Sequence, residues 1–295
     1  MKFLFLITLL FSCCIAQAKF QSKYTGYDMS KTFKSLQNLF RKISVLTEDT
    51  DIIKLFRNND KKIENFMDSN SDIVVCAGYH SIIKEEILSK KIIINTHPSL
   101  LPKYRGMHGL VWAMLNFEKE LGFSIHLMNK YIDDGDILEQ YKIHYEYQTS
   151  QEIMKKFDDY VLNNLGRVVK EFLQGKIIPQ KQNRNEATWV CKRNINDCLI
   201  DFSKSNKYIE MFFRALVSPY PLPMIRIKNK LYEISSYELK EAQYEMHLGR
   251  VINIEDNKAY IKISEGILII ENLIDFETKE KISDLSKFLK IGQRL

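Results

Sequence analysis

The residues best suited to chemistry in this sequence are an amide, an imidazole and a carboxylate, each placed after a short apolar run. The run Ile92-Ile93-Ile94 leads into Asn95 and His97, and its β-branched residues are typical of a buried strand. A second run, 123–128, precedes an acidic turn that contains Asp133. Ligands of open α/β sheets bind at the carboxyl ends of strands. A hydrogen-bond donor, a proton carrier and an orienting carboxylate would therefore meet at one sheet edge.

The residues around these groups predict the elements that would hold them. Strands and helices alternate along the first half of the chain, which is typical of a parallel sheet. The strand 72–77 would end at Gly78-Tyr79-His80, beside Asn95. Thr149-Ser150-Gln151-Glu152 is a capping box, and the helix that it opens would reach Leu173. Further strands are expected at 42–47, 123–128 and 141–145, and further helices at 52–67 and 109–118.

The first 18 residues allow two interpretations. Met1–Ala18 has a lysine, an apolar run and an Ala-Gln-Ala end, as a secretory signal does. Lys2–Thr8 also fits the first strand of a doubly wound sheet, which lies centrally and is buried on both faces. No other mark of secretion accompanies the segment. We therefore expect a strand here, retention of residues 1–18 in the mature protein, and a cytoplasmic location.

The C-terminal part predicts a smaller, β-rich domain. Residues 176–184 are polar and fit a linker, and a capped helix is expected from Ser203. Five short apolar runs then alternate with turn residues, which suggests a small OB-like barrel. We expect a catalytic domain at 1–183, a linker and connecting helix at 184–222, and the OB-like domain at 223–295. The five strands are expected at 224–227, 230–235, 249–254, 259–263 and 268–272.

Length and composition limit the class of protein. The 295 residues can hold one large and one small domain, and 27% charged and 45% apolar residues are ordinary for a globular protein. A net charge of +6 is mild and does not by itself indicate nucleic acid. Five cysteines without metal-type spacing argue against disulfides and zinc. No metal is expected, and Cys76 is interpreted as an inert buried thiol.

Three motifs, in order, make the chain resemble the folate-dependent formyltransferase family. Asn95-Thr96-His97, Ser99-Leu100-Leu101-Pro102 and Asp133-Asp134-Gly135 match the family's Asn-x-His, Ser-Leu-Leu-Pro and Asp-x-Gly signature. The resemblance continues through Ala187-Thr188-Trp189 and Ile200-Asp201-Phe202-Ser203 to the last strands, and it is weak before residue 40. It implies a Rossmann-like α/β fold, doubly wound around a mostly parallel sheet, followed by a small OB-like β-barrel domain.

The resemblance also implies roles for individual residues. Asn95, His97 and Asp133 would be catalytic, and 10-formyltetrahydrofolate would be the co-substrate. The sequence leaves open a shift of one residue along the acidic turn. His108 and His126 sit beside apolar residues and are interpreted as structural. The folate site would include Gly78, Tyr79, His80, Asp134, Gly135 and Asp136, and the acceptor site Ser99, Lys103, Tyr104 and Arg105.

The reaction that the resemblance implies is acyl transfer to an amine through a tetrahedral intermediate. Asn95 would donate to the developing oxyanion. His97 would act as the base or, once charged, as a second electrostatic stabiliser, and Asp133 would fix the imidazole tautomer and help retain the charge. Lys103 and Arg105 could grip a phosphate or carboxylate of the acceptor, or they could be solvated loop cations. A formyltetrahydrofolate hydrolase and a protein that binds folate without catalysis are the alternatives.

The segment 44–51 narrows the choice among possible acceptors. Its sequence, SVLTEDTD, is short and acidic, whereas the methionyl-tRNA formyltransferases of the family carry a long basic loop there, as a polyanionic acceptor requires. Glycinamide ribonucleotide enzymes lack a similar C-terminal domain. A nucleotide-linked amino sugar is therefore the leading acceptor, with initiator methionyl-tRNA as the alternative. No membrane contact is expected, and the protein could form a homodimer.

Overall fold

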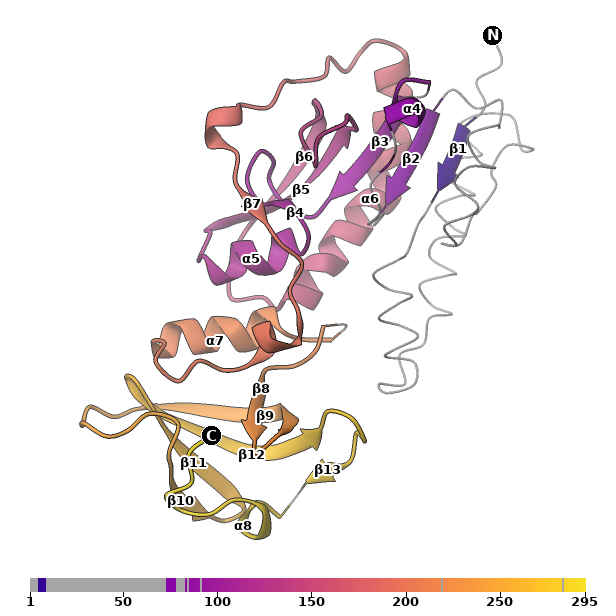
Figure 1. Ribbon diagram of the computed structural model, residues 1–295. Helices are drawn as coiled ribbons and strands as arrows, with labels where there is room; N and C mark the ends of the chain where they lie inside the picture. Colours follow the sequence, from indigo (N-terminus) through magenta and orange to yellow (C-terminus); the bar gives the residue numbers. More distant parts are fainter. Residues whose placement is uncertain are drawn as a thin grey trace. The chain divides into compact units, whose positions relative to one another are not determined.

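The computed structural model describes residues 5–8, 73–77, 83, 85–90, 92–218, 220–282 and 284–295. The chain forms two compact units: Met1–Glu146 with Glu152–Lys192, and Tyr147–Gln151 with Arg193–Leu295. The first unit combines a sheet with helices, and strands dominate the second (Figure 1). The strand expected at 42–47 and the helix expected at 52–67 lie outside the described residues.

The sheet of the first unit has the strand order β1-β2-β3-β5-β6 among the described residues. β1, β2 and β3 pair in parallel, as the sequence predicted. β5 is antiparallel to β3, and β6 to β5, so the described sheet is mixed rather than mostly parallel. The β5–β6 connection at 128–136 is shorter than the dozen residues of a parallel crossover, which makes the two strands a hairpin. The strands are Phe5–Thr8, Ile73–Ala77, Ile92–His97, Glu120–Leu127 and Ile137–His144.

The expected N-terminal strand is present as β1. It pairs with β2 in the register Phe5↔Ile73 to Thr8↔Cys76. Within the described strands β1 stands at the end of the order, not at its centre. Cleavage after Ala18 would take this strand away from β2, so retention of the first 18 residues stays our prediction.

Three described α-helices accompany this sheet: α4 (Glu85–Leu88), α5 (Gly109–Leu115) and α6 (Ser150–Leu173). α6 starts within the predicted capping box and ends at the predicted residue. α6 lies against the sheet (Figure 1), and the ring centroid of Phe157 on α6 is 5.6 Å from that of Phe123 on β5. Within the described part of the chain, no helix has both the length and the apolar character needed to cross a membrane.

A short parallel pair brings together two segments that are far apart in the sequence. β4 (Arg105–Gly106) pairs with β7 (Trp189–Val190), which follows the 3-10 helix η2 (Arg184–Glu186). The Arg105 N–H donates to the carbonyl of Thr188 at 2.9 Å. The chain that leaves α6 is therefore fixed against the loop that follows β3.

The second unit contains the predicted strands in a single sheet. β8 to β12 follow the order β10-β11-β12-β9-β8, with β13 added to β12. β8 and β10 do not pair within the described residues, so the expected barrel is not closed. Leu199 covers β8 by a bridge to Met224, and Arg294 bridges to Arg250 beside β10, so coil segments protect both edges. The bounds are η3 Ile195–Cys198, α7 Asn206–Ala215, β8 Met224–Ile227, β9 Lys230–Glu241, β10 Val251–Glu255, β11 Lys258–Ile263, β12 Gly266–Asp275, β13 Lys281–Ile282 and α8 Leu285–Phe288.

Candidate active site

Strand β3 places Asn95 and His97 on one face, because side chains two residues apart in a strand point the same way. Both are buried, with 7% and 5% of their surface exposed. The antiparallel register sets His126 of β5 opposite Asn95, and Ser124 opposite His97. The sheet edge predicted from the sequence therefore gains a second imidazole.

Within the described part of the chain, Asn95 makes one hydrogen bond through its amide nitrogen. His126 Nδ1 lies 2.7 Å from the carbonyl of Leu127, which can only accept, so Nδ1 carries a hydrogen. In the neutral ring Nε2 is then the acceptor, and Asn95 Nδ2 donates to it at 3.2 Å. Asn95 Oδ1 is buried and has no hydrogen-bond partner among the described residues. The side chain thus keeps a second amide hydrogen and a carbonyl oxygen for a ligand.

Asp133 lies between the two imidazoles. Its Oδ2 is 3.5 Å from His97 Nδ1, and its Oδ1 is 3.6 Å from His126 Nε2. The backbone N–H of Gly106 donates to Oδ2 at 2.8 Å. On the other side of its ring, His97 donates from Nε2 to the carbonyl of Tyr104 at 2.9 Å. His97 is therefore flanked by two acceptors, a carbonyl and a carboxylate.

Burial and charge set the protonation states of this group. Burial lowers the pKa of His97 below its usual value, although Asp133 and the Tyr104 carbonyl oppose this. Burial raises the pKa of Asp133, but its interactions with the two imidazoles and the Gly106 N–H outweigh burial and hold this pKa well below its usual range. At neutral pH the site therefore contains a neutral His97 beside an ionised Asp133.

Asp134 binds different partners from its neighbour Asp133. Arg105 Nη1 and Arg184 Nη2 each lie 2.7 Å from one of its carboxylate oxygens. These two guanidinium groups lower the pKa of Asp134, against the effect of burial. A Cβ on Gly135 would stand 1.7 Å from the carbonyl oxygen of Leu127, so only glycine fits there. The turn packs closely against the end of β5.

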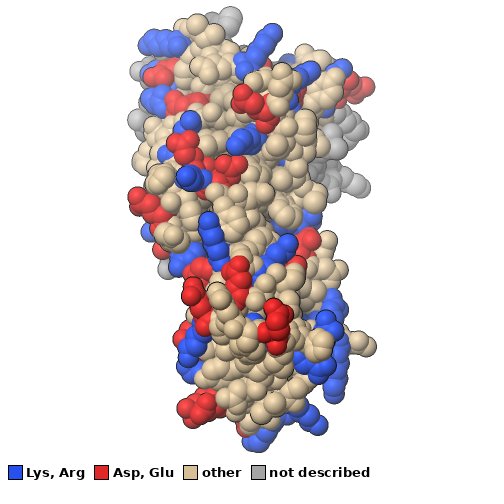
Figure 2. Space-filling model, turned by 90° about the vertical axis from the view of Figure 1, so that its left-hand side faces the viewer, with Lys and Arg blue, Asp and Glu red and all other residues tan. Residues whose placement is uncertain are grey.

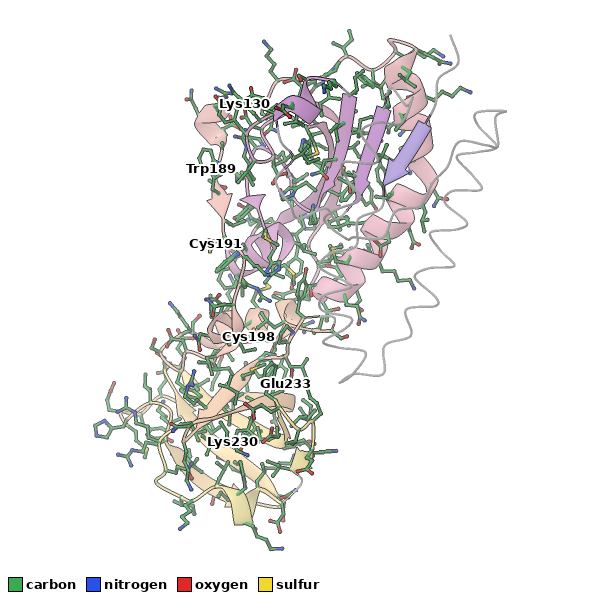
Figure 3. The ribbon with its side chains drawn as sticks, turned by 45° about the vertical axis from the view of Figure 1, so that its right-hand side comes forward. Lys130, Trp189, Cys191, Cys198, Lys230 and Glu233 are labelled. Carbon is green, nitrogen blue, oxygen red and sulfur yellow. The ribbon has the colours of Figure 1, made fainter. Side chains whose placement is uncertain are left out.

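The four predicted acceptor residues differ in burial and in their partners. Arg105 is 2% exposed and paired with Asp134, so it is not a solvated loop cation, and its binding of the acceptor stays a prediction. Its guanidinium lies 5.5 Å from the centroid of the Trp189 ring, and Figure 3 labels Trp189 on β7. Ser99 is buried, and its hydroxyl donates to the Lys103 carbonyl. The Lys103 side chain is 50% exposed and pairs with Glu118, to which Tyr104 also donates.

The remaining predicted residues lie partly outside the described part of the chain. Gly78, Tyr79 and His80 lie outside the described residues. Asp136 accepts from the Leu127 N–H through its backbone carbonyl. Burial raises the pKa of Cys76 to about 12, which agrees with an inert thiol. Within the described residues, no group of three or more His, Cys, Asp and Glu side chains could hold a metal ion.

Comparisons with known proteins agree with the motifs. The family models "Formyl transferase" and "Formyl transferase, C-terminal domain" match residues 30–169 and 194–291. A methionyl-tRNA formyltransferase from Caldanaerobacter subterraneus subsp. tengcongensis is 30% identical over 251 residues, which cover 84% of this chain and 80% of that protein.

Two solved structures illustrate the shared fold. An N-formyltransferase from Helicobacter canadensis, in complex with folinic acid and dTDP-3-aminofucose, has a TM-score of 0.60 at 18% identity and is matched over 91% of this chain and 98% of its own. HypX from Aquifex aeolicus has a TM-score of 0.66 at 17% identity, and the match covers 97% of this chain but only 48% of HypX. With the two family models and the sequence relative, the motifs show that this chain belongs to the formyltransferase family and is a folate-dependent formyltransferase.

Proposed function

We propose that the protein transfers a formyl group from 10-formyltetrahydrofolate to the primary amine of a nucleotide-linked amino sugar. The observation that supports the chemistry is the buried Asn95 amide, which keeps a donor and an acceptor unused beside His97 and Asp133. The observation that supports the acceptor is the near-neutral charge of the C-terminal residues.

The residues present fit the reacting end of the co-substrate. 10-Formyltetrahydrofolate supplies an activated formyl group attached to nitrogen. The second amide hydrogen of Asn95 can donate to the formyl oxygen, where negative charge develops, an effect worth about 3–4 kcal/mol for a single donor. The unpartnered Oδ1 can accept an N–H of the incoming amine. One amide would thus hold both reactants at the carboxyl end of β3.

His97 and Asp133 would manage the proton that the amine loses and that N10 of tetrahydrofolate gains when the bond from the formyl carbon to N10 breaks. The neutral His97 ring holds its hydrogen at Nε2, against the Tyr104 carbonyl, and has a lone pair at Nδ1. When Nδ1 takes a proton, the cation lies between that carbonyl and the Asp133 carboxylate. Asp133 would then stabilise a charge that exists only during the reaction, which is where stabilisation raises kcat.

This scheme gives a definite pH dependence. His97 acts only when neutral, so kcat/KM should fall as the pH drops through the His97 pKa, which lies below about 6.5. Asp133 stays ionised across this range. Because Asp133 raises the His97 pKa, Asp133→Asn should move the residual acidic limb to lower pH. The measurement is a pH–rate profile of both proteins, and a midpoint that moves upward in the variant would contradict the scheme.

Charge favours a small acceptor over a nucleic acid. Residues 193–295 contain 16 Lys and Arg against 15 Asp and Glu, a formal net charge of +1. Acidic and basic side chains are interspersed on the face shown in Figure 2. A tRNA acceptor would need several phosphates neutralised. A diphosphate needs one or two cations, and Lys103 and Arg184 keep 50% and 70% of their side chains exposed.

The second candidate acceptor is initiator methionyl-tRNA. It is favoured by the names of the sequence relatives, among them the 30% identical protein from Caldanaerobacter. The N-formyltransferase from Helicobacter, whose crystals contained a dTDP-amino sugar, is similar in fold alone.

The deciding experiment compares both acceptors side by side. Purified protein with 10-formyltetrahydrofolate is offered a panel of nucleotide-linked amino sugars and unformylated initiator methionyl-tRNA, between low and physiological salt. We expect formylation of a sugar with weak salt dependence and no formylation of the tRNA. Efficient tRNA formylation that falls steeply with salt would make the second candidate the function. Formate release without any acceptor would instead indicate a hydrolase.

A further inference from the structure

The position of Asp133 is not fixed by the two imidazoles that it serves. Its carboxylate oxygens stand 3.5 and 3.6 Å from the nearest nitrogens of His97 and His126, beyond good hydrogen-bond distance. Its backbone has φ 48°, in the left-handed region. That conformation costs a residue with a side chain about 1–2 kcal/mol and persists only where the surroundings impose it. Groups other than the two imidazoles must therefore hold this turn.

Gln182 is the group among them that binds the turn at two backbone carbonyls. Its Nε2 donates to the carbonyl of Asp133 at 2.8 Å and to the carbonyl of Gly135 at 2.7 Å. Both amide hydrogens of Gln182 are therefore bonded, one to each of the two backbone carbonyls on either side of Asp134. Its Oε1 accepts from Arg105 Nε and Nη2 at 3.2 and 2.7 Å. The carboxamide is therefore fully used, and it spans the acidic turn and the β4 strand.

Gln182 is also linked to the Asp133 carboxylate through strand β4, which contains Arg105 and Gly106. Arg105 binds Gln182 with one edge of its guanidinium and Asp134 with Nη1 at 2.7 Å. The next residue of β4, Gly106, donates its N–H to Asp133 Oδ2. Gln182 thus sets the distance between the turn that carries Asp133 and the backbone N–H that orients its side chain.

Only a neutral carboxamide suits this position. A glutamate would face the Asp133 and Gly135 carbonyls with oxygens that cannot donate, and a lysine would bring a second positive charge to Arg105. Methionine would fill the space with no hydrogen bond at all. We infer that Gln182 is a positioning residue for the reaction, one that holds the Asp133 carboxylate against His97. This inference rests on the proposed role of Asp133.

The test compares Gln182→Met with Gln140→Met. Gln140 is a matched control, because its Nε2 also makes two hydrogen bonds, to the Leu101 carbonyl in the loop after β3 at 2.8 Å and to Ser124 Oγ of β5 at 2.9 Å. We expect Gln182→Met to lower kcat about 10- to 100-fold, as small misplacements of a reacting group do. Its KM for 10-formyltetrahydrofolate should change less than threefold. The acidic limb should also move to lower pH, since Asp133 raises the His97 pKa. Gln140→Met should leave that limb in place.

Two further variants distinguish a loss of positioning from unfolding of the protein and from failure of the proposed site. Gln182→Glu retains the size and the Arg105 contact but loses both donors, so it should lower kcat even if the methionine variant unfolds. Gln182→Met in an Asp133→Asn background should cost little more than Asp133→Asn alone. An equal loss in both backgrounds, or an unmoved acidic limb, would overturn the inference. If Asp133→Asn itself turns over normally, the proposed site fails and this inference fails with it.

Discussion

Replacing His97 or Asp133 by asparagine is expected to lower turnover by roughly two to four orders of magnitude, the range of a lost general base. Both variants act on a charge that forms only in the transition state, so binding of the folate should stay within a few-fold. The neutral His97 lies 3.5 Å from the Asp133 carboxylate, and each substitution removes one side of that pair. Single-turnover rates and folate titrations measure the two effects separately.

A control in the same turn distinguishes chemistry from disturbance of the loop. Asp136→Asn replaces a carboxylate three residues along the chain, and Asp136 contacts Leu127 through its backbone carbonyl. It should retain most of kcat, and any contribution of Asp136 to the expected folate site would appear in KM for 10-formyltetrahydrofolate instead. Asp134→Asn is unsuited to this purpose, because Asp134 pairs with Arg105 and Arg184. Normal rates in both the His97 and Asp133 variants would show that the reaction takes place elsewhere.

The local part of the site could be predicted from the sequence. Asn95 and His97 share a face because a strand alternates its side chains, and a β-branched run before them marks the strand. The choice between Asp133 and Asp134 could not be made in that way. It depends on a left-handed backbone at Asp133, φ 48°, which turns one carboxylate toward His97 and the other toward Arg105.

The partners that the sequence did not reveal come from distant pairings. His126 was interpreted as structural because its neighbours are apolar, and only the antiparallel register of β3 and β5 places it opposite Asn95. Gln182 lay in an expected linker, yet it binds a turn 47 to 49 residues earlier. In the second unit the strands were predictable from local turns, whereas the coil segments that cover β8 and β10 were not.

Arg105 shows how burial reverses an expected effect. As a loop cation, it would contribute to acceptor binding and little to stability. As a guanidinium that is 2% exposed and bound to Asp134 and Gln182, it should matter chiefly for folding. Removing one partner of a buried ion pair typically costs about 3–5 kcal/mol, because the other charge stays buried. We expect Arg105→Met to lower the free energy of unfolding by about this amount.

Lys103→Met is the matched control for Arg105→Met. Lys103 is two residues away and pairs with Glu118 at 3.1 Å, but half of its side chain is exposed. A surface pair of this kind is worth about 0–1 kcal/mol, so its unfolding curve should nearly coincide with that of the unaltered protein. Urea unfolding of the three proteins, followed by circular dichroism, gives the comparison. If Arg105→Met keeps its stability and only raises KM for the acceptor, Arg105 binds the acceptor, and the pairing with Asp134 must open during the reaction.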